Sequence, residues 1–245
     1  MNRILSLILI LFVSCEKSVT QQTNIPRNEQ PVVIAVVNEV SKNEDNKSSF
    51  LSRVQRGDIV KIACQGTSLT YGHDTQSPDR LPASPGIPVQ NTRSVFQYPS
   101  TLKDSLTFAA IVVNRGYSAD KAKDGLIRWK DSIQADVVIL EYGTNEALRS
   151  YSIETFKTEL SEMIERHINQ GSYVIVCMPP FMNNSRPSTI PFREAVKELS
   201  AKYHAGLFDV QNAINSIPYL LSDGIHLTAE ANRKWGKAMV AFLKG

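Results

Sequence analysis

Four short segments of the chain contain residue types that acyl transfer requires. They are residues 66–72 (GTSLTYG), 114–118 (NRGYS), 143–146 (GTNE) and 223–227 (DGIHL). Together they supply a serine hydroxyl, an imidazole with a nearby carboxylate, and glycine and asparagine groups that donate hydrogen bonds. An activated hydroxyl can attack an ester carbonyl, and such donors can stabilise the oxyanion that forms. This chemistry requires the four segments to meet in one place.

Ser68 is the candidate nucleophile. It follows the apolar run 58–64 and lies between Gly66 and Gly72, which permit a tight turn from a strand into a helix. Its hydroxyl would then lie at the edge of a sheet, and its N–H would favour negative charge on an attacked carbonyl oxygen. A capped loop rich in Gly, Ser and Thr has the same composition, so this segment alone leaves both interpretations open.

Asp223 and His226 form the candidate acid–base pair. The two residues are close enough in sequence for both side chains of one short loop to reach a single cleft. An imidazole can take the proton of a serine and return it to a leaving group, while the carboxylate holds the tautomer and stabilises the imidazolium. An exposed loop histidine beside an aspartate is also common, so this pattern is weak by itself.

Gly116 and Asn145 are the candidate oxyanion donors. Gly116 would offer its backbone N–H and Asn145 its side-chain amide, and each lies just after an apolar run. Both residues are also frequent in ordinary turns, where glycine adopts a left-handed conformation. Neither segment would point to catalysis if it stood alone.

Alternating apolar runs and helical patterns predict the elements that must position these residues. Continuous apolar runs typical of buried parallel strands occur at residues 58–64, 108–113, 135–140, 173–178 and 206–210. Amphipathic patterns predict helices at residues 152–170, 191–203 and 228–243. The alternation predicts an α/β fold, a three-layer α/β/α sandwich with a five-stranded parallel sheet and ligands at the carboxyl ends of the strands. A further apolar run at 31–40 is expected to add an edge strand or to pack outside.

In this order and these contexts, the four segments resemble the SGNH branch of the GDSL hydrolase family, from about residue 58 to the C-terminus. The resemblance implies a flavodoxin-like fold and a serine esterase. It implies Ser68, His226 and Asp223 as catalytic residues, and Ser68, Gly116 and Asn145 as the oxyanion hole. Two positions depart from the family pattern. Thr67 replaces the expected Asp, which puts the local loop geometry in doubt, and Glu146 stands where Asp is frequent.

Composition limits the other classes of function. The 245 residues suit one catalytic domain, and a net charge of +3 is spread without a basic stripe, so no nucleic-acid partner is expected. The four histidines lack metal-ligand spacing, so neither a metal nor another cofactor is expected. Cys64 and Cys177 lie in apolar runs and are expected to be buried without a disulfide. The oligomeric state is not indicated.

The N-terminus is expected to serve in export. Residues 1–15 have the charge and apolar length of a signal peptide and end at a lipobox-like Cys15, the expected site of lipidation. Residues 16–50 are expected to form a polar tether with an additional strand, and residues 51–245 the hydrolase domain. We therefore expect an exported lipoprotein that is attached to a membrane through this lipid anchor. A cleaved leader or an uncleaved anchor with an incidental Cys15 is the alternative.

The expected substrate is a small acyl ester, with acetyl groups on a carbohydrate or cell-envelope glycan preferred. Polar residues near strand ends, among them Arg149, Asn183, Asn184 and Arg186, predict a polar rim that suits a sugar better than a fatty chain. The irregular stretch 73–100 either walls the cleft or is an inert excursion. A lysophospholipase or thioesterase, a transacylase, and a noncatalytic glycan-binding lipoprotein remain as alternatives.

Overall fold

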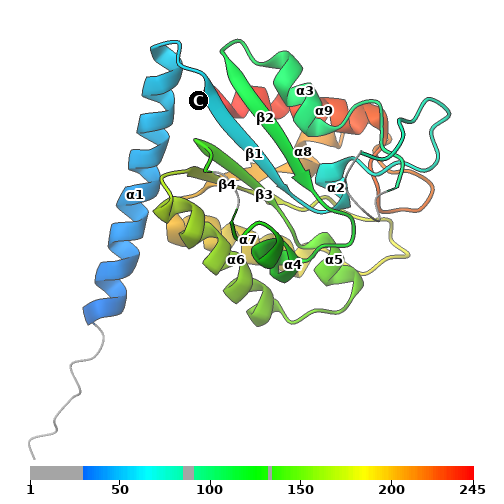
Figure 1. Ribbon diagram of the computed structural model, residues 1–245. Helices are drawn as coiled ribbons and strands as arrows, with labels where there is room; N and C mark the ends of the chain where they lie inside the picture. Colours follow the sequence, from blue (N-terminus) through cyan, green and yellow to red (C-terminus); the bar gives the residue numbers. More distant parts are fainter. Residues whose placement is uncertain (1–29, 85–90, 132–133) are drawn as a thin grey trace, which may run out of the picture.

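A five-stranded parallel sheet forms the centre of the protein. The structure is a computed structural model that describes residues 30–84, 91–131 and 134–245, with side chains described from residue 42 onward. The strands are β1 (Val60–Gly66), β2 (Ala110–Gly116), β3 (Val137–Glu141), β4 (Tyr173–Met178) and β5 (Gly206–Asp209). They lie in the order β2-β1-β3-β4-β5, and every neighbouring pair is parallel (Figure 1). The predicted five-stranded parallel sheet is confirmed.

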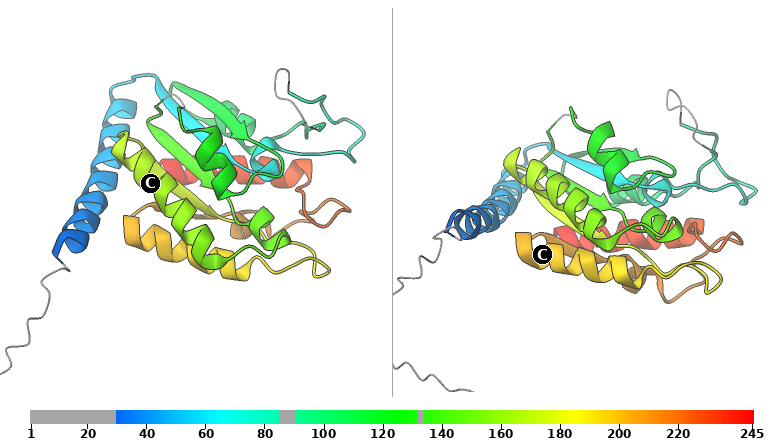
Figure 2. Two further views of the ribbon diagram at one scale, coloured as in Figure 1. Left: turned by 60° about the horizontal axis from the view of Figure 1, so that its bottom comes forward. Right: turned by 90° about the horizontal axis from the view of Figure 1, so that it is seen from below.

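Nine helices occur in the described part of the chain. They are α1 (Gln30–Gln55), α2 (Ser68–Tyr71), α3 (Tyr98–Ser105), α4 (Ala122–Arg128), α5 (Thr144–Leu148), α6 (Ile153–Asn169), α7 (Ile190–Tyr203), α8 (Val210–Ile214) and α9 (Ala229–Leu243). Helices α3, α8 and α9 pack on one face of the sheet, and α4, α6 and α7 on the other (Figures 1 and 2). The three-layer α/β/α prediction is therefore confirmed.

The alternation of side chains along the strands explains why both faces are covered. Val137 and Ile139 of β3 point into the core beneath α9, whereas Val138 and Leu140 point into the core beneath α6. All five residues of β3 are buried. A strand with apolar groups on both faces is stable only between two layers of helices, because each face removes apolar surface from water.

Residues 31–40 are helical and form no edge strand, so the first of the two alternatives expected for them is wrong. They lie within α1, which continues across the boundary predicted at residue 51. The second half of α1 belongs to the folded unit, because Phe50 is buried in the core and the Asn43 side chain is fully buried. The Asn43 amide nitrogen donates to the carbonyl of His204 and its oxygen accepts from the N–H of Val174, which fixes α1 beside the amino end of β4.

The predicted signal peptide, its Cys15 and the part of the polar tether before residue 30 lie outside the described residues. Within the described ranges, none of the helices has the length and apolar character needed to cross a bilayer.

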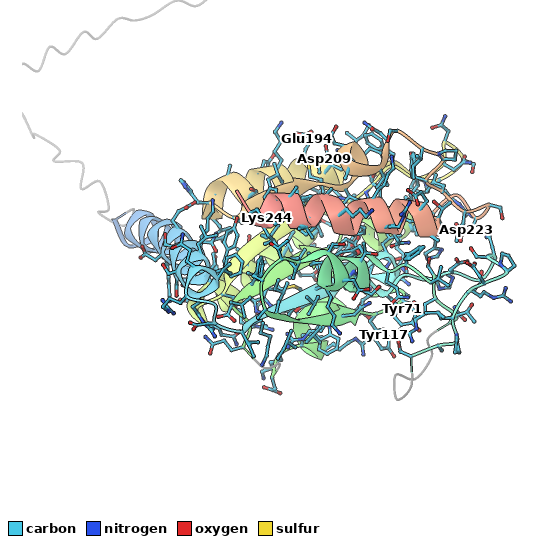
Figure 3. The ribbon with its side chains drawn as sticks, turned by 90° about the horizontal axis from the view of Figure 1, so that it is seen from above. Tyr71, Tyr117, Glu194, Asp209, Asp223 and Lys244 are labelled. Carbon is cyan, nitrogen blue, oxygen red and sulfur yellow. The ribbon has the colours of Figure 1, made fainter. Side chains whose placement is uncertain are left out.

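The two ends of the sheet differ in what surrounds them. Helix α1 lies by the amino ends of the strands, and Asp223 lies at the opposite end of the molecule (Figure 3). The turns that follow β1, β2 and β3 all leave from the carboxyl edge, because the strands are parallel. In folds of this type ligands bind at that edge, and three of the four candidate segments lie on these turns.

Candidate active site

Ser68 is the first residue of α2 and follows β1 after a single connecting residue. Thr67 caps the helix, and its hydroxyl oxygen accepts a hydrogen bond from the N–H of Leu69. The helix ends at Gly72, whose φ of 83° is left-handed and therefore favours glycine. Strand, tight turn and one helical turn thus place the Ser68 hydroxyl at the carboxyl edge of the sheet, as the sequence predicted.

A buried carboxylate explains the departure at Thr67. Oε2 of Glu141, the last residue of β3, accepts hydrogen bonds from the Thr67 N–H, the Thr67 hydroxyl and the Thr70 hydroxyl, at 3.1, 2.7 and 3.1 Å. Burial raises the pKa of Glu141 to about 7, although these three hydrogen bonds oppose the rise. The Thr67 hydroxyl acts as a donor that an ionised Asp would lack, so Thr67 suits the carboxylate already present at Glu141.

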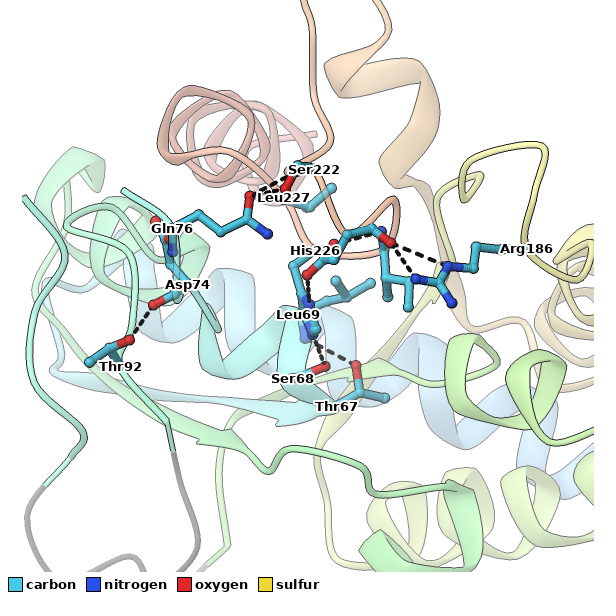
Figure 4. Close-up of polar contacts among 12 residues, drawn as sticks. Thr67, Ser68, Leu69, Asp74, Gln76, Thr92, Arg186, Ser222, His226 and Leu227 are labelled. Carbon is cyan, nitrogen blue, oxygen red and sulfur yellow. Dashed lines mark hydrogen bonds and ion pairs between the residues drawn. The ribbon is translucent and has the colours of Figure 1, made fainter. Parts of the chain in front are cut away.

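Ser68, His226 and Asp223 form one continuous hydrogen-bonded line (Figure 4). Nε2 of His226 lies 2.9 Å from the Ser68 hydroxyl oxygen, and Nδ1 of His226 lies 2.7 Å from Oδ2 of Asp223. Both distances are those of hydrogen bonds that can transfer or hold a proton. The loop between α8 and α9 therefore brings the imidazole to the serine from a distant part of the chain, as the sequence predicted.

The Asp223 carboxylate is held in its charged form. Burial alone would raise the pKa of Asp223, but hydrogen bonds from the His226 ring and from the N–H groups of His226 and Ile225 outweigh it and lower the pKa. The same loop is fixed from outside, because the Arg186 guanidinium donates to the Asp223 carbonyl and the Asn183 N–H donates to the Gly224 carbonyl. An anchored carboxylate keeps the His226 ring in one orientation.

Asn145 lies in α5, directly after β3, and its side chain is buried. Its amide nitrogen donates to the carbonyl of Asp120 at 2.8 Å, which places Asn145 against the turn after β2. Glu146 also joins the turn after β3 to the turn after β2. Its Oε2 accepts a hydrogen bond from the Gly143 N–H, and its Oε1 accepts one from the Ala122 N–H. Burial raises the pKa of Glu146 to about 7. The larger carboxylate at this position is a structural link between two loops of the site.

Gly116 does not fit the role of oxyanion donor, and the structure corrects that prediction. Its N–H already donates to the Asn114 side-chain oxygen at 2.9 Å. A Cβ at Gly116 would lie 2.1 Å from the backbone nitrogen of Tyr71, so glycine is needed here for the close approach of β2 to α2. Gly116 is therefore a packing residue.

Ala119 has the conformation that was expected of Gly116. Its φ is +68°, which is rare outside glycine and common where a backbone is held for function. Arg149 donates to the Ala119 carbonyl and Asn145 to the next carbonyl, while the Ala119 N–H has no acceptor among the described residues. Ala119 is not predicted by the sequence, because no local signal marks an alanine with positive φ.

The stretch 73–100 lies beside the acid–base loop at its start and belongs to the core at its end. Oε1 of Gln76 accepts hydrogen bonds from the N–H and hydroxyl of Ser222 (Figure 4). Tyr98 begins α3, is fully buried and stacks on Trp235 with ring centroids 3.8 Å apart, so it does not line a cleft. Residues 85–90 lie outside the described part of the chain.

The two described cysteines lie in the core. Cys64 and Cys177 are free and buried, and burial raises the pKa of the Cys64 thiol to about 12. Neither forms a thiolate at neutral pH in such surroundings. Among the residues that the structure describes, no group of three or more His, Cys, Asp or Glu side chains is arranged to hold a metal ion.

Comparisons with known proteins identify the family of the chain. The model of the GDSL-like Lipase/Acylhydrolase family matches residues 64–234. An arylesterase from Vibrio mimicus is 26% identical over 174 residues, a match that covers 66% of this chain and 83% of the arylesterase.

Solved structures share the fold. A lipase/acylhydrolase from Enterococcus faecalis superposes with a TM-score of 0.62 at 23% identity, covering 76% of this chain and 96% of that one. An acetylxylan esterase from Geobacillus stearothermophilus superposes with a TM-score of 0.58 at 17% identity, covering 76% and 94%. The family match spans more than half of the chain and includes all four candidate segments. The chain therefore belongs to the GDSL-like lipase/acylhydrolase family of SGNH/GDSL hydrolases and is a carboxylic ester hydrolase.

Proposed function

We propose that the protein hydrolyses esters of small acyl groups through a Ser68–His226–Asp223 triad and an acyl-enzyme intermediate. The main support is the unbroken line of hydrogen bonds, 2.9 Å from Ser68 to His226 and 2.7 Å from His226 to Asp223. Nucleophile, base and orienting carboxylate are then in contact in the free protein, and no movement is needed to assemble them.

The reaction proceeds in two half-reactions. Nε2 of His226 takes the Ser68 proton as the hydroxyl oxygen attacks the ester carbonyl, and the tetrahedral oxyanion collapses when the alcohol leaves with that proton. Water then attacks the acyl-serine and gives a proton to His226, which returns it to the departing Ser68 oxygen as the acid is released. Asp223 stays ionised and stabilises the imidazolium in each half.

The proposed oxyanion hole consists of the Ser68 N–H, the Asn145 side-chain amide and the Ala119 N–H, with Ala119 in place of Gly116. Asn145 and the turn of Ala119 are fixed against each other by the hydrogen bond to the Asp120 carbonyl. Donors held in place before the reaction stabilise the developing charge without reorganising.

For substrate we propose acetyl groups on a carbohydrate or cell-envelope glycan. A pocket of about 530 Å³ opens beside the acid–base loop. Its lining combines polar groups of Asn183, Asn184, Arg186 and Ser188 with the Tyr219 and Phe181 rings and the apolar side chains of Met182, Pro187 and Ile190. Aromatic rings next to amide and guanidinium donors suit a sugar, whereas a long acyl chain needs an apolar tunnel. One structural neighbour is an acetylxylan esterase, which supports this class of substrate.

Two measurements test the proposal. Ser68→Ala is expected to abolish hydrolysis of p-nitrophenyl acetate and labelling by a fluorophosphonate probe while the melting temperature is kept. Activity that survives in Ser68→Ala would exclude the triad. Labelling without turnover of any ester would instead favour a binding protein.

A series of p-nitrophenyl esters from acetate to decanoate then tests the acyl length. We expect kcat/KM to fall steeply beyond four carbons. A maximum at eight or more carbons would favour a lysophospholipase or thioesterase. Addition of a sugar alcohol during acetate turnover separates hydrolysis from transacylation, because only a transacylase forms the acetylated sugar.

We also propose, on the sequence pattern of residues 1–15, that the protein is exported and anchored to a membrane through lipid on Cys15. Metabolic labelling with palmitate tests this. Wild-type protein should incorporate the label, and a Cys15→Ala variant labelled equally would contradict the proposal.

A further inference from the structure

His73 packs its ring against the ring of His226. The two ring centroids lie 4.0 Å apart with an angle of 30° between the planes, which is a stacked arrangement. His73 follows α2 directly, and its N–H donates to the Ser68 carbonyl at 2.9 Å. The segment that contains the nucleophile thus also supplies a flat surface for the ring that faces it.

The backbone around His73 is fixed on several sides. Gly72, in its left-handed conformation, donates to the Ser68 carbonyl and accepts from the Ser94 N–H. The Asp74 N–H donates to the Thr92 carbonyl, and the Thr92 hydroxyl donates back to the Asp74 carbonyl (Figure 4). These bonds fix the backbone position from which the His73 ring extends to stack on His226.

A second contact joins the same two segments. Ser222, which precedes Asp223, donates from its N–H at 2.9 Å and from its hydroxyl at 2.8 Å to Oε1 of Gln76. The start of the stretch 73–100 therefore contacts the acid–base loop at two points. His73 stacks on His226, and Gln76 accepts hydrogen bonds from Ser222.

The charges around His73 favour a neutral ring. Burial is the main cause that lowers the pKa of His73 to about 4, and a charged His226 lowers it further, while Asp223 and Asp74 act in the opposite direction. Two cations belong to the same segment: Arg80 interacts with Asp74, and Arg93 is paired with His73 through the backbone. At neutral pH His73 thus presents an uncharged aromatic face to an imidazole that must itself accept a proton.

We propose that His73 is a positioning residue that holds the His226 ring in line between Ser68 and Asp223 by stacking on its face. This inference rests on the proposed triad. The hydrogen bonds to Asp223 and Ser68 fix the two ring nitrogens of His226, and the bond to Ser68 is lost while the serine is acylated, so that the ring can then rotate about its side-chain bonds. A flat neighbour at van der Waals distance restricts the remaining rotation and keeps water from one face of the ring.

A matched pair of substitutions separates the effect of a planar ring from the effect of side-chain volume. His73→Phe keeps a planar aromatic group, whereas His73→Leu fills a similar volume without one. Arg80→Ala, on the same segment and away from His226, is the control. For each variant kcat and KM are measured with p-nitrophenyl acetate from pH 5 to 9, together with the melting temperature and the fraction of molecules that a fluorophosphonate labels.

The proposal expects His73→Leu to lower kcat per labelled site about 10-fold with KM changed less than twofold, because the misaligned ring affects the reaction and not binding. His73→Phe should restore kcat to within threefold of wild type, and Arg80→Ala should match wild type.

Equal kcat values in His73→Leu and His73→Phe would overturn the proposal, whether both resemble wild type or both are slow. Normalising to labelled sites keeps this comparison valid if either variant folds incompletely. Ser68→Ala and His226→Ala are measured alongside. If Ser68→Ala or His226→Ala retains activity, the proposed triad is wrong. If both are inactive while His73→Leu and His73→Phe have equal kcat, only the role of His73 is excluded.

Discussion

Nε2 of His226 lies 2.9 Å from the Ser68 hydroxyl, although 158 positions of sequence separate the two residues. Ser68 is placed by the turn after β1, and His226 by the loop that precedes α9. The loop of His226 is in turn fixed by bonds from Arg186 and Gln76, which come from opposite sides (Figure 4). The contact therefore depends on three separate segments, and changes in any of them are expected to alter catalysis.

Asp223→Asn should lower kcat by about 10³- to 10⁴-fold with little change in fold. The amide can still accept the backbone N–H bonds of Ile225 and His226, but its other group donates where the His226 Nδ1–H needs an acceptor, so the wrong tautomer is favoured. Steady-state kinetics with p-nitrophenyl acetate measure the loss. A loss below tenfold would mean that Asp223 does not orient the base.

Asn145→Ala should lower kcat by about 10²- to 10³-fold, the usual effect of removing one oxyanion donor. Its lost bond to the Asp120 carbonyl should reduce the free energy of unfolding by about 1 kcal/mol. Asn212→Ala, at an exposed position of α8, is the matched control and should leave kcat within threefold. Equal activity of the two variants would remove Asn145 from the oxyanion hole.

Ala119→Gly should stabilise the protein by about 1 kcal/mol without loss of activity, because glycine adopts a φ of +68° without strain and keeps the backbone N–H. Urea unfolding and kcat/KM measure the two effects. His204→Gly, with a φ of +48° at the end of α7, is the control for the conformational effect. A stabilised Ala119→Gly enzyme with tenfold lower kcat/KM would show that the methyl group, and not only the N–H, has a role.

Thr67→Asp, which introduces the residue common in the family, should destabilise this chain by about 2–3 kcal/mol. The new carboxylate would lie at the buried Glu141 oxygen that Thr67 now bonds at 2.7 Å, and two such groups repel each other. Adding Glu141→Gln should recover part of the loss, because an amide can donate to Asp. Urea unfolding of the two single variants and the double variant gives the coupling, and additive effects would contradict the direct interaction.

Glu141→Gln should also change how stability depends on pH. The pKa of Glu141 is about 7 in the folded protein and 4.5 in the reference state, so its contribution is fully present below pH 4.5 and is lost as the pH rises through 7. Wild type should therefore lose up to about 3 kcal/mol relative to the variant over this window. Glu146, His73 and His167 titrate in both proteins and cancel in the difference. A pH-independent difference in urea unfolding would show that Glu141 ionises normally.

Much of the fold could be predicted because strong local patterns agree with the tertiary structure. Residues 173–178 are β4 without a change of boundary, and the helix predicted at 152–170 is α6 with Ser152 as its cap. Residues 31–40 misled the interpretation because their β-branched, apolar composition favours a strand. The same helix continues to Asn43, and the contact of Asn43 with the backbone of β4 cannot be read from the sequence.

The sequence could predict which side chains form the site, but it could not predict which backbone N–H groups do. Ser68, His226, Asp223 and Asn145 have side chains whose chemistry is visible in the sequence, and the first three meet as expected. A backbone N–H donor is defined by φ and ψ, and every residue except proline has one. Glycine was therefore an unreliable guide, because at Gly116 it serves the close approach to Tyr71.

Helix α1 and the catalytic serine lie at opposite ends of the sheet. The helix has 26 residues and is about 39 Å long, at roughly 1.5 Å per residue, and its second half packs beside the amino end of β4. Under the proposed lipidation of Cys15, the chain would be attached on the α1 side of the molecule. The carboxyl edge with Ser68 would then stay open to substrates that arrive from the surrounding water.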